Sequence, residues 1–135
     1  MAEAMTKNAQ QVWYNAANKP WLLTQKPFRV APRVYYVGNT WVGAYLIDTG
    51  DGLVLIDTTV FEGVYLVLES IRDLGYDPHE IKHILLTHCH VDHSGGVNQI
   101  KAISGARVWQ SREDTDFMTQ PANLELGDQF KIAEY

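Results

Sequence analysis

Three histidines and one aspartate stand within six residues of one another, at His88, His90, Asp92 and His93. Imidazole and carboxylate groups are ligands that zinc takes in proteins. In extended backbone, His88 and His90 lie on one face and can contact the same ion, while Cys89 points the other way into packing. Asp92 and His93 are adjacent, so only a turn can direct both of them toward a second ion. The spacing therefore predicts a metal site for two ions.

The elements around this motif are expected to hold it at the end of a strand. The apolar run from Ile81 to Thr87 predicts that strand, and a helix is expected to run from Gly96 to about Ser104. Gly95 and Gly96 are expected to let the backbone turn sharply beneath the ions. His79 and His83 precede the motif and are expected to face solvent or the rim of the sheet.

A β-hairpin is predicted before the motif. Residues 41–48 and 53–56 have the pattern of two strands, and the Thr-Gly-Asp-Gly segment at 49–52 is typical of a tight turn. Asp57 follows the second strand directly. It is either a helix cap or part of a functional site, because open sheets place their sites at the carboxyl ends of strands. A helix is predicted from Phe61 to Leu74.

The two ends of the chain have less definite patterns. Residues 1–27 are polar with scattered aromatics and predict an N-terminal arm with a short helix near residues 9–17, ended by Pro20. The aromatics of the arm either pack across the fold or line a substrate cleft. After a strand at residues 106–109, Ser111 is expected to cap a short helix, with Asp114 completing a capping box. Residues 124–135 resemble a strand that stops without a terminating signal.

The stretch from His88 to His93 resembles the zinc signature of the metallo-β-lactamase superfamily of hydrolases. The segment 45–59, with Asp57 at its end, is similar to the early hairpin of that family, and the resemblance spans about residues 28–110. It implies that His88 and His90 bind one Zn²⁺ ion and that Asp92 and His93 bind a second. It also implies that Asp57 steadies the metal loop from behind the ligands.

The resemblance implies an α+β fold, the four-layer αββα sandwich of that family. Family members are longer than 135 residues, so residues 28–135 are expected to be the N-terminal half of such a domain in a truncated chain. A half-sandwich leaves one face of its sheet without a partner, and this face is expected to pair with the missing C-terminal half or with another copy of the chain.

The function implied by the resemblance is hydrolysis of a small-molecule substrate. The motif is most similar to that of the β-lactamase subclass without a cysteine ligand, which predicts amide hydrolysis by a zinc-bound hydroxide with Asp92 as a catalytic residue. A thioester or lactone hydrolase of the glyoxalase II type remains the alternative. Family members carry a further histidine for each zinc, whereas this chain has no histidine after His93. A non-catalytic metal-binding or interaction fragment therefore also stays open, and the chain alone is expected to be inactive or weak.

The amino-acid composition and net charge limit which partners and locations are expected for the protein. Apolar residues make up 46% of the chain, which is enough for a core, and the formal net charge is −5. An acidic chain is poorly suited to bind a phosphate backbone, so no nucleic-acid partner is expected. No apolar run of signal-peptide or membrane-spanning type occurs in the sequence. We therefore expect no membrane contact and a cytoplasmic protein, or a periplasmic or secreted one if a signal peptide has been removed.

Overall fold

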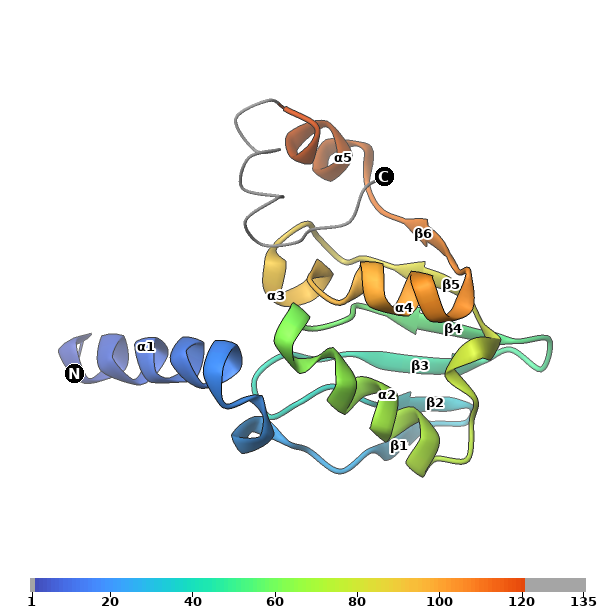
Figure 1. Ribbon diagram of the computed structural model, residues 1–135, viewed down its shortest axis with the longest axis horizontal. Helices are drawn as coiled ribbons and strands as arrows, with labels where there is room; N and C mark the ends of the chain where they lie inside the picture. Colours follow the sequence, from blue (N-terminus) through green and yellow to red (C-terminus); the bar gives the residue numbers. More distant parts are fainter. Residues whose placement is uncertain (1, 121–135) are drawn as a thin grey trace.

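The structure of the protein, a computed structural model, describes residues 2–120, with side chains from residue 8 onward. Its sheet has six strands in the order β1-β2-β3-β4-β5-β6 (Figure 1). The strands are β1 (Phe28–Ala31), β2 (Val34–Tyr36), β3 (Tyr45–Asp48), β4 (Leu53–Ile56), β5 (Ile81–Leu85) and β6 (Arg107–Trp109). The α-helices are α1 (Ala2–Asn18), α2 (Val64–Asp73), α3 (Val91–Ser94), α4 (Val97–Ser104) and α5 (Arg112–Met118). Short 3-10 helices span Pro20–Leu23 (η1), Phe61–Gly63 (η2) and Pro78–Glu80 (η3).

The direction of pairing changes at β4. Strands β1 to β4 pair antiparallel, and β4, β5 and β6 pair parallel. The β3–β4 hairpin closes through a hydrogen bond from the Thr49 N–H to the Gly52 carbonyl, and Gly50 and Gly52 have φ angles of 83° and 114° that suit glycine. Parallel neighbours need crossover connections, which α2 and α4 supply. The carboxyl ends of β4 and β5 therefore meet at one edge of the sheet.

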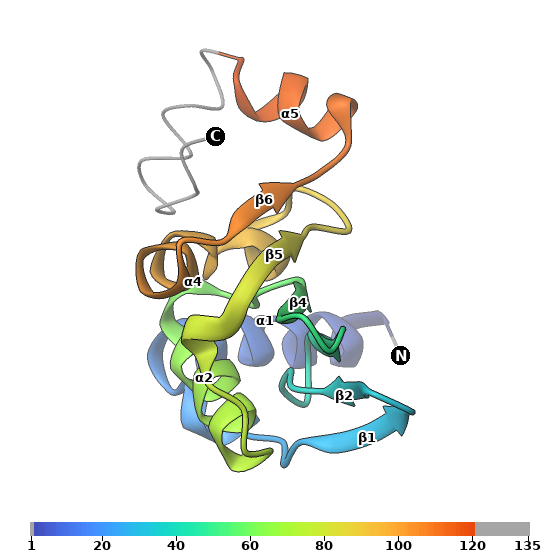
Figure 2. The ribbon, with the colours of Figure 1, turned by 90° about the vertical axis from the view of Figure 1, so that its right-hand side faces the viewer.

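The core lies between the sheet and the two crossover helices. Figure 2 shows α2 and α4 on the same side of the sheet. Alternate residues of the central strands face this side, so Leu46, Leu55 and Ile84 are fully buried. Ile71 of α2 and Ile100 of α4 are equally buried and belong to the same cluster. The predicted α+β class is confirmed, with helices covering one face of the sheet.

The opposite face of the sheet carries a row of apolar side chains that no described element covers. The strand register aligns one residue from each strand across the sheet, namely Phe28, Tyr36, Tyr45, Ile56, Leu85 and Trp109. Phe28 is 49% exposed, Leu85 39% and Trp109 47%. Between residues 2 and 120, the sheet thus forms two layers with its helices and keeps a second face open.

The N-terminal arm is more helical than expected. Helix α1 begins at Ala2 rather than near Ala9, because residues 2–18 contain neither proline nor glycine to interrupt it. Its Ala16 is buried with Leu23 and Val60, and the ring of Trp13 meets the ring of Trp41 edge-on at 4.6 Å. These contacts agree with the packing interpretation of the arm.

Two strand predictions were too long. The segment 41–44 is a loop, because the Asn39 side-chain oxygen accepts hydrogen bonds from the backbone N–H groups of Trp41 and Val42, so β3 begins only at Tyr45. Strand β5 ends at Leu85 rather than Thr87, because the Thr87 N–H donates to Asp57 instead of to a neighbouring strand.

None of the described helices combines the length and the apolar composition that a membrane crossing requires. The strand expected over residues 124–135 lies outside the described residues.

Candidate metal centre

The metal motif begins in a loop and ends in a short helix. Residues 86–90 follow β5 without regular structure, and α3 starts at Val91. His88 and His90 therefore stand in the loop beyond the end of β5 and not in the strand itself. The loop nevertheless brings their rings together, with centroids 4.8 Å apart.

The first turn of α3 brings the remaining two candidate ligands to the same place. The rings of His93 and His88 have centroids 4.1 Å apart, and His93 Nε2 lies 3.6 Å from Asp92 Oδ2. The side chains of Asp92 and His93 are 19% and 23% exposed, so both are reached by solvent from one side only. The structure thus gathers all four predicted ligands in one cluster, beyond the carboxyl ends of β4 and β5.

Asp57 lies directly behind this cluster and is 4% exposed. One carboxylate oxygen accepts a hydrogen bond from the Thr87 N–H at 2.8 Å, and the other accepts one from the Thr87 hydroxyl at 2.7 Å. The second oxygen also lies 2.8 Å from His93 Nδ1. Because a carboxylate only accepts, His93 Nδ1 must be the donor, and in the neutral imidazole this leaves the lone pair on His93 Nε2.

The same reasoning fixes the tautomer of His88. Thr87 Oγ1 lies 3.1 Å from His88 Nδ1, and the single proton of this hydroxyl is already donated to Asp57. His88 Nδ1 must therefore donate to Thr87 Oγ1, so its Nε2 also keeps a lone pair. Asp57 thus fixes His93 directly and His88 through Thr87, which is how outer partners orient the imidazole ligands of a metal.

The segment after β4 also supports the start of α3. The N–H and the hydroxyl of Thr58 both donate to the His93 carbonyl, at 2.8 and 2.9 Å. The neighbouring residues Asp57 and Thr59 have φ angles of 57° and 62°, a left-handed conformation that costs energy outside glycine, above all for a β-branched residue. Backbone strain is therefore concentrated beside the predicted ligands.

Gly95 and Gly96 serve close packing rather than a sharp turn. Their φ angles, −61° and −88°, are ordinary for any residue, so the predicted reason for these glycines was wrong. A Cβ atom on Gly95 would lie 2.7 Å from the backbone nitrogen of Phe61, and one on Gly96 would lie 2.7 Å from the Thr58 carbonyl oxygen. The segment carrying the ligands therefore lies directly against the backbone that follows β4.

No pattern in the sequence connects Asp114 of α5 with this site. Its Oδ1 accepts a hydrogen bond from the Cys89 N–H at 3.2 Å, although 25 residues separate the two. Ser111 caps α5 as predicted, and its hydroxyl donates to Asp114 Oδ2 at 2.7 Å. The hydrogen bonds from Ser111 and then Cys89 hold the pKa of the Asp114 carboxyl below its usual range.

Cys89 is half-buried rather than packed away, and burial, followed by the nearby Asp114 carboxylate, raises the pKa of its thiol to about 11. Its thiol therefore stays protonated at neutral pH, as expected for a cysteine that is not a nucleophile.

The two earlier histidines have partners of their own. The exposed ring of His79 lies 2.7 Å from Asp77 Oδ1, just before β5. His83 Nδ1 accepts a hydrogen bond from the indole of Trp109 at 3.0 Å, on the open face of the sheet.

A family model, described as the metallo-beta-lactamase superfamily, matches residues 42–131. The chain belongs to this superfamily. Its fold also matches solved members: a subclass B3 metallo-β-lactamase of Bradyrhizobium japonicum is 35% identical with a TM-score of 0.71, covering 76% of this chain and 39% of that one. A B3 metallo-β-lactamase with an active-site glutamic acid is 42% identical with a TM-score of 0.69, covering 73% of this chain and 37% of that one.

Superfamily members of another activity are similar as well. A hydroxyacylglutathione hydrolase of Albidiferax ferrireducens is 38% identical over 63 residues, which cover 47% of this chain and 23% of that protein. The chain thus spans less than half the length of the superfamily members that it matches.

The donor set of this superfamily member fits zinc in its chemistry. In their neutral forms, His88 and His93 have Nε2 as the unprotonated ring nitrogen, and Asp92 supplies a carboxylate beside His93. Within residues 2–120, however, no three His, Cys, Asp or Glu side chains are arranged so that they could hold an ion as they stand.

Proposed function

We propose that the protein is a zinc-dependent hydrolase in which His88 and His90 bind one ion and Asp92 and His93 bind a second. The observation that supports this most strongly is the pair of tautomers set by Asp57 and Thr87, because both leave Nε2 free for a metal. A merely structural histidine cluster does not require that the Nδ1 atoms carry the protons in both rings.

Different residues have different roles in the proposed hydrolysis. Bound zinc supplies a water of lowered pKa and polarises the carbonyl that is attacked. Asp92 is the proposed catalytic residue, since its partly exposed carboxylate lies beside His93 and can accept a hydrogen bond that orients the attacking water. Asp57 is a positioning residue and is too deeply buried to contact a substrate.

For the substrate we propose a β-lactam or a related small-molecule amide. The similar solved structures are B3 metallo-β-lactamases, and they align over about three quarters of this chain. Two proposed ligands for each zinc fall short of the three protein ligands usual at catalytic zinc. The 135-residue chain by itself is therefore expected to bind zinc weakly and to turn over little substrate.

A thioester hydrolase is the second candidate. Hydroxyacylglutathione hydrolases are 37–38% identical to this chain over 62–66 residues, and their name indicates hydrolysis of an acyl-glutathione. Both candidate reactions transfer an acyl group to water, and the ligand cluster alone does not distinguish them.

The experiment compares a chromogenic β-lactam with a hydroxyacylglutathione as substrates of the full-length protein, loaded with zinc and tested beside its Asp92→Ala variant. We expect faster turnover of the β-lactam and its loss in the variant. Turnover of only the thioester would favour the second candidate. Zinc binding without turnover of either substrate would favour a non-catalytic metal-binding protein.

A further inference from the structure

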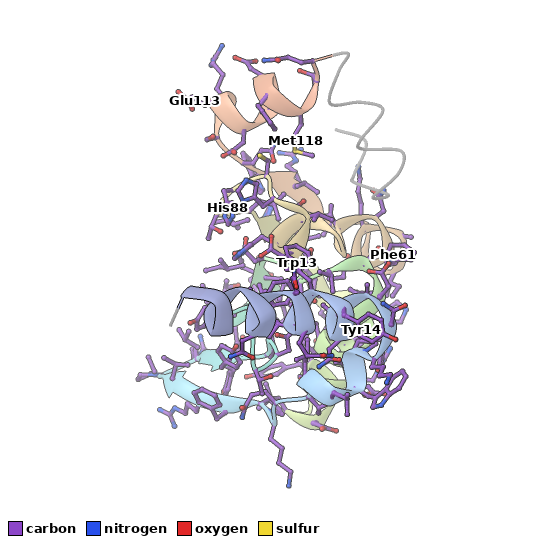
Figure 3. The ribbon with its side chains drawn as sticks, turned by 90° about the vertical axis from the view of Figure 1, so that its left-hand side faces the viewer. Trp13, Tyr14, Phe61, His88, Glu113 and Met118 are labelled. Atoms are coloured by element: carbon purple, nitrogen blue, oxygen red, sulfur yellow. The ribbon has the colours of Figure 1, made fainter. Side chains whose placement is uncertain are left out.

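Helix α5 lies apart from the helices that cover the sheet, yet it contacts the metal loop. Figure 1 shows α5 beyond β6, away from α2 and α4. In Figure 3, His88 lies between α5, marked by Glu113 and Met118, and the rest of the fold. The contact that joins α5 to the loop is the hydrogen bond from the Cys89 N–H to Asp114 Oδ1.

This hydrogen bond acts on the backbone of Cys89, the residue between two proposed ligands. Cys89 stands between His88 and His90, and its carbonyl accepts a hydrogen bond from the Ser94 hydroxyl at 3.0 Å. Both backbone polar groups of Cys89 are therefore occupied, its N–H by Asp114 and its C=O by Ser94. These bonds limit rotation of the two peptide groups on either side of the Cys89 Cα, and so limit the directions in which the two flanking imidazoles can point.

The Asp114 carboxylate is itself held in place. Its Oδ2 accepts from the Ser111 hydroxyl at 2.7 Å, and the Ser111 Oγ accepts from the Asp114 N–H at 3.0 Å. A side chain fixed at its own helix can transmit the position of that helix to the loop, whereas a freely rotating carboxylate cannot. Asp116 lies on the same helix with an exposed side chain and provides a matched comparison.

We propose that Asp114 is a positioning residue of the metal site, which holds the peptide between His88 and His90 in the orientation needed for both imidazoles to bind one zinc ion. This inference rests on the proposed zinc site. It adds to that site a residue outside the ligand motif, on helix α5.

The test uses the full-length protein and its Asp114→Ala, Asp114→Asn and Asp116→Ala variants. Zinc affinity is measured by competition with a chromophoric chelator, and the visible spectrum of the Co²⁺-substituted protein reports the ligand geometry. We expect Asp114→Ala to weaken zinc binding about 10-fold or more and to change the Co²⁺ spectrum. Asp114→Asn keeps an oxygen that accepts from Cys89 and should recover most of the affinity, whereas Asp116→Ala should match the parent.

If Asp114→Ala does not fold, Asp114→Glu replaces it, because the extra methylene displaces the carboxylate while keeping its charge; the same loss is expected. If the parent binds metal and the Ala or Glu variant has the same zinc affinity and the same Co²⁺ spectrum, this inference is overturned and the proposed function is not. A parent that binds neither zinc nor Co²⁺ would overturn the proposed function, and this inference with it.

Discussion

Replacing Asp57 with asparagine removes the charge behind the ligands while keeping the side-chain shape. The carboxylate accepts from the Thr87 N–H, from the Thr87 hydroxyl and from His93 Nδ1. An asparagine that still accepts from the Thr87 N–H must place its NH₂ group where Oδ2 stood. This donor then faces Thr87 Oγ1 and His93 Nδ1, two atoms that donate to Oδ2 in the parent.

The expected result is a reversal of tautomers. His93 Nδ1 becomes an acceptor, so its proton moves to Nε2, the nitrogen 3.6 Å from Asp92. Zinc binding must then restore the original tautomer and leave a buried donor without a partner, at a cost of about 1–3 kcal/mol. That cost corresponds to an affinity loss of about 5- to 150-fold, which overlaps the 10- to 100-fold loss typical of outer metal partners.

The assay is a zinc titration of the full-length Asp57→Asn variant, with the melting temperature recorded in parallel. Asp51→Asn is the control, since its side chain is 98% exposed and pairs only with Lys82 at the far end of the hairpin. Unchanged zinc affinity in Asp57→Asn together with a lowered melting temperature would refute the tautomer argument. Asp57 would then be only a structural cap, worth about 1 kcal/mol.

Three further expectations concern other parts of the molecule. Asp92→Ala in the full-length protein should remove one of two zinc equivalents and most of kcat together; metal analysis showing both ions retained would contradict this. Gly96→Ala should lower the free energy of unfolding in urea by about 1–3 kcal/mol, because its Cβ would lie 2.7 Å from the Thr58 carbonyl oxygen. In the control variant Gly43→Ala the nearest atom is a tyrosine ring carbon at 3.3 Å, so the free energy of unfolding should fall by less. The open sheet face should make the 135-residue chain self-associate, since exposed apolar area costs about 25 cal/mol per Å². Leu85→Lys should shift sedimentation toward monomer, and a parent chain that is monomeric at high concentration would argue against an interface there.

The sequence alone indicated the proposed metal ligands and most of the helices and strands. Periodic apolar residues predicted α2, α4 and the central strands, because burial of one face imposes a spacing that can be counted along the chain. Residues 88–93 contain all four proposed ligands, so the sequence was sufficient to identify them and to recognise the resemblance to the superfamily.

Only the tertiary structure decided how these residues are held. Asp57 and His93 are 36 residues apart, and Asp114 and Cys89 are 25 apart, so no local pattern indicates either contact. The resemblance implied that Asp57 steadies the loop, but not which atoms it would contact. Gly96 illustrates the same limit. A glycine is needed there because the Thr58 carbonyl, from a different segment, approaches it closely, and not because its own backbone angles are unusual. The spacing of residues along the chain predicts only local secondary structure. Hydrogen-bond partners and close backbone contacts depend on which distant segments the folded core brings together.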